Sequence, residues 1–90
     1  MKTLNDDLLA FSELGNLQMV KMIIENSASI HTNNDYALSN AAYHGHLNIV
    51  KYLVENGADI HAVGDYVLRH AARNGHLDVV KYLEGLRKQQ

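Results

Sequence analysis

The chain has 90 residues, a formal net charge of -2 and no cysteine. This length fits one small domain, and the absence of a basic excess argues against sequence-independent nucleic-acid binding. Without cysteine the chain forms no disulfide and has no thiolate metal site or thiol nucleophile. The N-terminal stretch lacks the apolar core of a secretory signal, and no apolar run is long enough to span a bilayer. We therefore expect an intracellular, cytoplasmic protein without membrane contact.

In chain order, three similar units are predicted at about residues 1–31, 32–61 and 62–90 of a single domain, and each reads as two short helices. Asn5, Asp35 and Asp65 stand where the first helix of each unit begins and are predicted N-caps. Gly45 separates the two helices of the second unit, and Gly57 suits a left-handed position after its second helix. The short helices and turn-rich connectors predict an all-α fold.

The three units repeat with a period of 30 residues. The segment GHLNIVKYL at 45–53 returns as GHLDVVKYL at 75–83 with only two changes. Small residues recur in the first helices, as Ala41-Ala42 and Ala71-Ala72, and would let neighbouring helices approach closely. One such helix pair cannot bury its own apolar face, whereas stacked pairs can. The repeat therefore predicts a solenoid of three stacked helix-turn-helix units.

These segments resemble the ankyrin repeat. The resemblance rests on AAYHGHLNIVKYLVENGADIHA at 41–62 and AARNGHLDVVKYL at 71–83, and extends more weakly over residues 4–31. It implies that His46 and His76 are structural histidines at the start of each second helix. It also implies that partners bind at the turn tips and the exposed side of the first helices.

Two departures from the ankyrin pattern change the expected shape. The usual Thr-Pro-Leu-His opening is replaced by Tyr-Ala-Leu-Ser at 36–39, and the unit is shorter than the family's period of about 33 residues. The shortening falls between Ala62 and Leu68, so we expect a reduced turn in place of a full β-hairpin. This short variant is similar to ankyrin arrays of giant DNA viruses of amoebae, and a designed or excised protein would also show such regular units.

The outer units are expected to act as caps. Glu84 stands where the second unit has Val54, and the polar segment LEGLRKQQ at 83–90 follows. A charge on the uncovered end would limit self-association. In the first unit, Ser27 replaces the glycine found at 57, so glycine at position 27 is predicted to stabilise the chain if that position is left-handed.

A metal site and an active site are both disfavoured by the residue pattern. Histidines related by the repeat would lie on helices about 8–10 Å apart, too far to share one ion. Asp59 is expected to bond its own turn and Asp78 to complement a helix N-terminus. No phosphate-binding loop or nucleophile elbow is present. We expect no cofactor, no metal and no enzymatic activity, and a catalytic or metal-binding domain stays as a rival.

The two positions that follow each alanine pair differ between units, as partner-contacting positions would. They are Tyr43-His44 and Arg73-Asn74, with Glu13-Leu14 in the first unit. Tyr and Arg are also enriched in interface hot spots, although each of these side chains could equally be solvated or pack locally. The predicted partner-binding residues are Tyr36, Tyr43, His44, Tyr66, Arg69, Arg73 and Asn74.

The predicted function is non-catalytic recognition of a protein partner by a rigid concave surface. Such a stacked framework loses little flexibility when it binds. The alternative is a minimal repeat scaffold or array fragment without a partner of its own. The expected state is a monomer, with end-to-end self-association possible.

Overall fold

The computed structural model describes residues 4–26 and 30–89. Six α-helices follow one another: α1 (Leu4–Leu14), α2 (Leu17–Glu25), α3 (Thr32–Tyr43), α4 (Leu47–Glu55), α5 (Asp65–Arg73) and α6 (Leu77–Lys88). A short 3-10 helix, η1 (Ile60–Ala62), lies between α4 and α5. No β-strand occurs within the described ranges. Position 27, where glycine is predicted to stabilise the chain, lies outside them.

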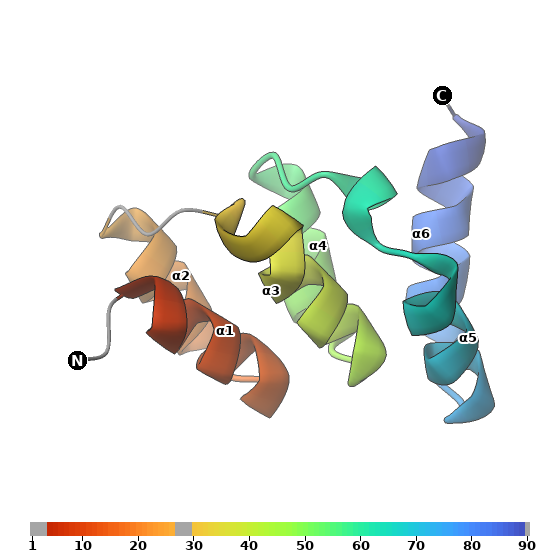
Figure 1. The fold of residues 1–90 in the computed structure, drawn as a ribbon, viewed down its shortest axis with the longest axis horizontal. Helices are drawn as coiled ribbons and strands as arrows, with labels where there is room; N and C mark the ends of the chain where they lie inside the picture. Colours follow the sequence, from red (N-terminus) through yellow and green to blue (C-terminus); the bar gives the residue numbers. More distant parts are fainter. Residues whose placement is uncertain (1–3, 27–29, 90) are drawn as a thin grey trace.

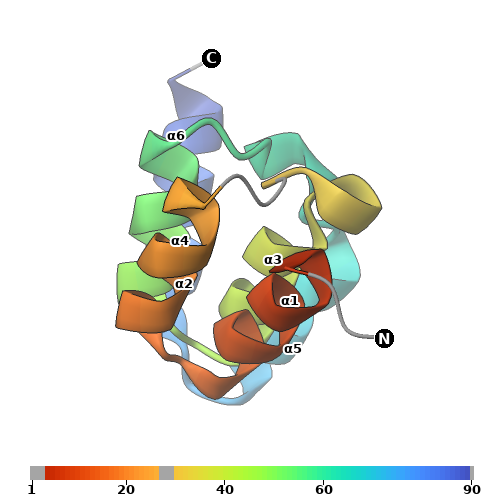
Figure 2. The ribbon, with the colours of Figure 1, turned by 90° about the vertical axis from the view of Figure 1, so that its left-hand side faces the viewer.

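The helices form two rows. The first helices α1, α3 and α5 make one row, and the second helices α2, α4 and α6 make the other (Figures 1 and 2). Each helix contacts its partner in the same unit and the corresponding helix of the next unit. The molecule extends 35 × 27 × 20 Å, and its core lies between the rows. The predicted all-α solenoid of three stacked helix pairs is confirmed.

Small and branched side chains share the core between the rows. Ala41 and Ala42 of α3 are fully buried, which allows α1 and α5 to pack closely on either side. Leu53 and Leu83 of the second helices fill the space between the rows and are also fully buried. Ala72, in contrast, is exposed on the outer side of α5. Small residues on the first helices and large residues on the second helices let each unit pack on the next through nearly the same surface.

The joint between the two helices of a unit depends on glycine. Gly15 and Gly45 have φ of 80° and 79°, a region that disfavours a side chain. A Cβ on Gly45 would lie 2.4 Å from Nδ1 of His76, and one on Gly15 would lie 2.7 Å from Cε1 of His46. The imidazole of each following unit therefore packs directly on the glycine of the unit before it.

The histidines also form part of the frame between units. His46 is the N-cap residue of α4, and its Nε2 donates to the main-chain carbonyl of Glu13, 2.8 Å away. His76 is the N-cap residue of α6. Gly57 has φ of 100°, as predicted from its place after α4. The structural role expected for both histidines agrees with these positions.

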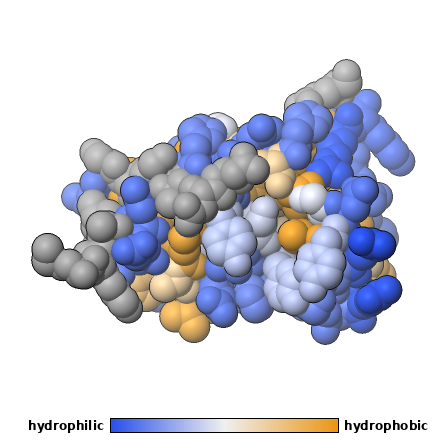
Figure 3. All heavy atoms as spheres, viewed as in Figure 1, coloured by the Kyte–Doolittle hydropathy of each residue, from blue (hydrophilic) through white to orange (hydrophobic). Residues whose placement is uncertain are grey.

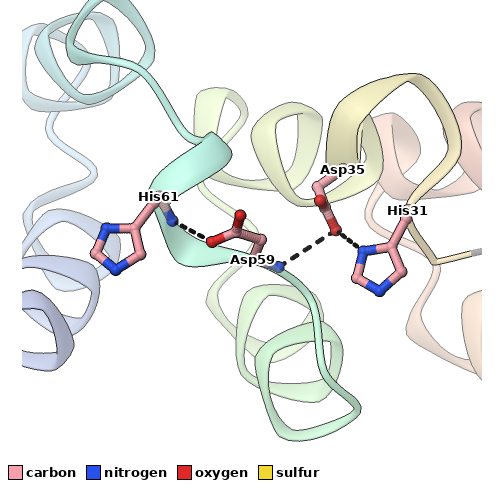
Figure 4. Close-up of polar contacts among 4 residues, drawn as sticks. All are labelled: His31, Asp35, Asp59 and His61. Atoms are coloured by element: carbon pink, nitrogen blue, oxygen red, sulfur yellow. Dashed lines mark hydrogen bonds and ion pairs between the residues drawn. The ribbon is translucent and has the colours of Figure 1, made fainter. Parts of the chain in front are cut away.

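The first helices begin differently from the prediction. The N-cap of α5 is Gly64 rather than Asp65, and Asn5 lies inside α1. Asp35 also lies inside α3, where it has φ of 61°, a left-handed conformation that aspartate tolerates better than most residues. Its buried carboxylate accepts from His31 Nδ1 at 2.7 Å (Figure 4). The N-cap predictions are therefore wrong.

The shortened connector between the second and third units is held by side chains. The Asp35 carboxylate also accepts a hydrogen bond from the main-chain N–H of Asp59 at 3.3 Å, which ties α3 to the connector (Figure 4). Asp59 in turn accepts from the N–H of His61 at 2.9 Å, as expected for a local turn. Short polar contacts thus replace the β-hairpin that a longer unit would form.

The last helix acts as a clamp on this connector. α6 continues to Lys88, whereas α4 ends at Glu55, because Arg87 stands where the second unit has the left-handed Gly57. The Arg87 guanidinium donates to the carbonyl of Ile60 at 3.2 Å and to that of Val63. The C-terminal end of α6 therefore contacts η1 through Arg87 and also presents charge to solvent.

Candidate functional site

Aromatic side chains gather on the exposed side of the first helices. We call this surface the tyrosine face and define it by Tyr36, Tyr43, His44, Tyr66 and His70. Space-filling spheres show pale aromatic rings over α3 and α5, next to a small apolar area (Figure 3). Tyr36 is 47% exposed and Tyr66 is 66% exposed, so packing within the chain accounts for only part of either ring.

The centre of the tyrosine face is a stack of rings from two units. Tyr43 and His70 lie face to face, with centroids 3.7 Å apart and planes inclined by 8°. Tyr66 is 6.3 Å from Tyr43, and His44 meets Tyr43 edge-on at 5.1 Å. These contacts fix the orientation of the Tyr43 ring. Loss of hydration, together with the neighbouring phenols of Tyr66 and Tyr36, raises the pKa of the Tyr43 phenol above its ordinary value of 10.0.

A depression of about 370 Å³ lies beside the stack. Tyr36 and Tyr43 of α3 form its aromatic lining, and Glu13 reaches it from the end of α1. Ser39 and Asn40, which are nearly buried, also line it. The site thus combines aromatic surface with oxygen atoms that can accept hydrogen bonds.

The remaining predicted contact residues, Asn74, Arg73 and Arg69, lie on α5 or at its C-cap, outside the ring stack. Asn74 is the C-cap residue of α5, and its side-chain amide donates to the carbonyl of His70 at 2.8 Å. Arg73 is exposed in the last turn of α5. Arg69 lines a separate depression of about 410 Å³ at the C-terminal end, together with Glu84 and Arg87. Neither Arg69 nor Arg73 forms an ion pair with another described residue.

The tyrosines of the second helices contact lysines of the same chain. The ammonium of Lys21 lies 5.6 Å from the ring of Tyr52, and that of Lys51 lies 5.6 Å from the ring of Tyr82. Both tyrosines are half-buried, and the same contact recurs from unit to unit. These rings pack between consecutive units. Burial and the nearby Glu55 carboxylate raise the pKa of Tyr82.

The described residues offer no preformed centre for a metal ion. His44 and His46 have ring centroids 6.2 Å apart, and no group of three or more His, Cys, Asp or Glu side chains in the described ranges is placed to hold an ion.

Across those same ranges, none of the helices combines the length and the apolar character needed to cross a bilayer. Asp78 accepts from the N–H of Val79 at 2.8 Å, near the start of α6.

The comparison with known families decides the relationship. The family model described as ankyrin repeats, in three copies, matches residues 8–88. The chain belongs to the ankyrin-repeat family. Ankyrin repeats are in general protein-interaction modules and are typically not enzymes. A comparison with curated proteins gives no match.

In this ankyrin-repeat protein, sequence reasoning missed part of the tyrosine face. His70 was not singled out, although it lies four residues after Tyr66 and therefore on the same side of α5. Ser39 and Asn40 were also missed, because polar residues on an inner helical position carry no functional signal by themselves. Their place beneath two tyrosines depends on the stacking of three units, which sequence periodicity does not resolve side chain by side chain.

Proposed function

We propose that residues 1–90 form a single protein-interaction domain that binds its partner on the tyrosine face. The observation that carries this proposal is the pair of exposed rings, Tyr36 and Tyr66, on the same face as the Tyr43–His70 stack. Large rings held in place before binding contribute contact area at little entropic cost. The proposed contact residues are Tyr36, Tyr43, His44, Tyr66, Arg73 and Asn74, with Arg69 at the outer edge.

The proposed partner is a protein in the cytoplasm rather than a nucleic acid. The net charge of -2 gives no electrostatic attraction to a phosphate backbone, and the absence of cysteine suits a reducing compartment. Rigidity supplies the mechanism. The stacked repeats hold the rings of α3 and α5 in one arrangement, so the partner meets a formed surface.

A capture experiment tests this proposal. Purified wild-type chain should retain a partner from a lysate of the source cells, and a Tyr43→Ala/Arg73→Ala variant should lose that partner. The matched control is Glu25→Ala/Lys81→Ala, which removes exposed side chains from the second helices. Thermal melting of all three proteins checks that the folds are comparable. Identical sets of captured proteins for the wild type and the tyrosine-face variant would contradict the proposal.

A second candidate function is a scaffold or array fragment that stacks further units on its C-terminal end. The depression lined by Leu68, Ala72 and Val80 at that end favours it, because the matching surface of the second unit is covered. Glu84 and Arg69 in the same depression oppose it by presenting charge. Glu84→Val should therefore increase end-to-end association in sedimentation experiments, and unchanged sedimentation would contradict the capping role of Glu84.

A further inference from the structure

The floor of the depression beside the tyrosine stack is formed by polar residues. Ser39 and Asn40 are 7% and 9% exposed, and both line the depression. Asn40 Nδ2 donates to the carbonyl of Leu9 at 3.2 Å, which orients the amide. Its Oδ1 and the Ser39 hydroxyl accept no hydrogen bond from another described residue. Oxygen atoms that face an open depression and have no partner in the chain can accept hydrogen bonds from a ligand that donates them.

The rim adds negative charge. The side chain of Glu13 is 57% exposed, and its Oε1 lies 3.8 Å from Nε2 of His44, beyond hydrogen-bond distance. Its carboxylate oxygens can therefore still accept strong hydrogen bonds. No lysine or arginine lines this depression. The His44 imidazole also lines the depression next to Glu13, and the Glu13 carboxylate gives the site an acceptor for a cationic group.

The walls add aromatic surface. Tyr36 and Tyr43 both line the depression, and the Tyr43 ring is held by its stack on His70. Tyrosine rings attract cations placed over their faces. An ammonium group could meet these rings or the carboxylate, but it is a compact point charge. A guanidinium is flat, stacks on aromatic rings and directs several N–H donors outward in its plane.

From these three features we propose that the depression lined by Glu13, Tyr36, Ser39, Asn40 and Tyr43 binds an arginine side chain of the protein partner. The guanidinium lies against the tyrosine rings and donates to the Glu13 carboxylate and to the oxygen atoms of Ser39 and Asn40. A volume of about 370 Å³ accommodates one long side chain with some water. This inference rests on the proposed function, because it names the group by which the partner is recognised.

The test uses short peptides and the purified chain. The peptide acetyl-Gly-Arg-Gly-amide is titrated into labelled protein, and binding is followed by the shifts of backbone amide signals in NMR spectra. Saturable shifts are expected around Glu13 and along residues 36–44. The matched peptide with citrulline, which has the same shape and no charge, should not bind. The peptide with lysine should bind measurably more weakly than the arginine peptide.

Variants locate the site. Glu13→Gln should weaken binding of the arginine peptide about fivefold, as expected for loss of a partly exposed charge pair. Tyr36→Leu should weaken it by a similar factor through loss of the ring face. Glu25→Gln, on the exposed side of α2, should leave the affinity unchanged. Equal binding of arginine and citrulline, equal binding of arginine and lysine, absence of shifts, or shifts confined to the C-terminal depression would each overturn the inference.

The outcome separates the inference from the proposed function. Loss of partner capture by the Tyr43→Ala/Arg73→Ala variant, together with no arginine-peptide binding, would remove only the inference. Peptide binding by a chain whose captured proteins do not change in that variant would contradict the proposed function instead.

Discussion

The second helices and the exposed sides of the first helices belong to the same units, yet they repeat very differently. α4 begins LNIVKYL and α6 begins LDVVKYL, whereas Tyr43-His44 in one unit becomes Arg73-Asn74 in the next. Residues recur where a side chain must pack against the neighbouring unit. They vary on the exposed side of the first helices, although Tyr43 there still stacks on His70 of the next unit. The first group forms the framework, and the second includes the residues that we propose contact a partner.

Tyr36 and Tyr66 are an instructive exception. They recur at the same position of consecutive units, and yet both are exposed. The recurring tyrosines of the second helices, Tyr52 and Tyr82, are half-buried and lie beneath lysines. Packing explains the second pair and leaves the first pair without a structural role of similar weight. Changes to the framework should therefore lower stability, and changes to the exposed first-helix surface should alter binding.

The largest expected effect on the framework comes from Gly45→Ala. The new Cβ would require a φ near 79° and would approach Nδ1 of His76 to 2.4 Å, so the His76 ring or the backbone that carries it must shift. We expect the free energy of unfolding to fall by about 2–4 kcal/mol. Gly75→Ala is the matched control, because φ is 81° there and nothing lies within 4 Å. Its cost should be only about 1 kcal/mol. Equal losses in urea denaturation would show that His76 does not pack on Gly45.

The next effect concerns the clamp formed by the last helix. Arg87→Met keeps most of the aliphatic stem but removes the donors to the carbonyls of Ile60 and Val63. The free energy of unfolding should fall by about 1–2 kcal/mol, since hydrogen bonds from a charged group are lost. Lys88→Met, at an exposed position, should leave it nearly unchanged. A melting temperature of Arg87→Met equal to that of the wild type would contradict the clamp.

A stabilising change of similar size is expected in the first unit. Ser12 occupies the position of Ala42 and Ala72, is fully buried, and its hydroxyl has no hydrogen-bond partner among the described residues. Ser12→Ala should raise the free energy of unfolding by about 1 kcal/mol, because a buried polar group without a partner is removed. Ser39→Ala serves as the control and should be close to neutral, since the Ser39 side chain lines an open depression. Destabilisation by Ser12→Ala would show that its hydroxyl is bonded in solution.

The smallest expected effect is a pH dependence on the tyrosine face. Because the pKa of Tyr43 is raised in the fold above its ordinary value of 10.0, the unfolded chain loses this proton first. The associated stability is complete below about pH 10 and is lost as the pH rises through the folded pKa. Tyr43→Phe should therefore flatten the decline in unfolding free energy above pH 10. An unchanged decline in denaturation at several alkaline pH values would contradict the desolvation of this phenol.

Much of the fold could be predicted from the sequence, because each unit repeats the residues that pack it. The period of 30, the alanine pairs and the left-handed glycines all correspond to features of the structure. The starts of the first helices could not be predicted, since Asp35 bonds His31 and the distant Asp59 instead of capping its own helix. The continuation of α6 through Arg87 could not be predicted either, because Arg87 bonds carbonyl groups in the connector between α4 and α5.

The sequence predicted which surface carries the candidate site but not which of its side chains lie together. Repeat comparison indicated the exposed side of the first helices and its tyrosines. The Tyr43–His70 stack joins two units, and the depression joins residues of α1, α3 and α5. Such groupings depend on how far one unit is rotated against the next. Arg69 illustrates the same limit, because its side chain lines the C-terminal end rather than the tyrosine stack.

Site-specific photo-crosslinking in a lysate of the source cells tests the central claim most directly. A benzophenone amino acid is placed at position 66, on the exposed side of α5, or at position 81, on the exposed side of α6. The account predicts a discrete crosslinked partner from position 66 and none from position 81. Crosslinking of that partner from position 81 but not from position 66 would show that the second helices, rather than the tyrosine face, make the contact.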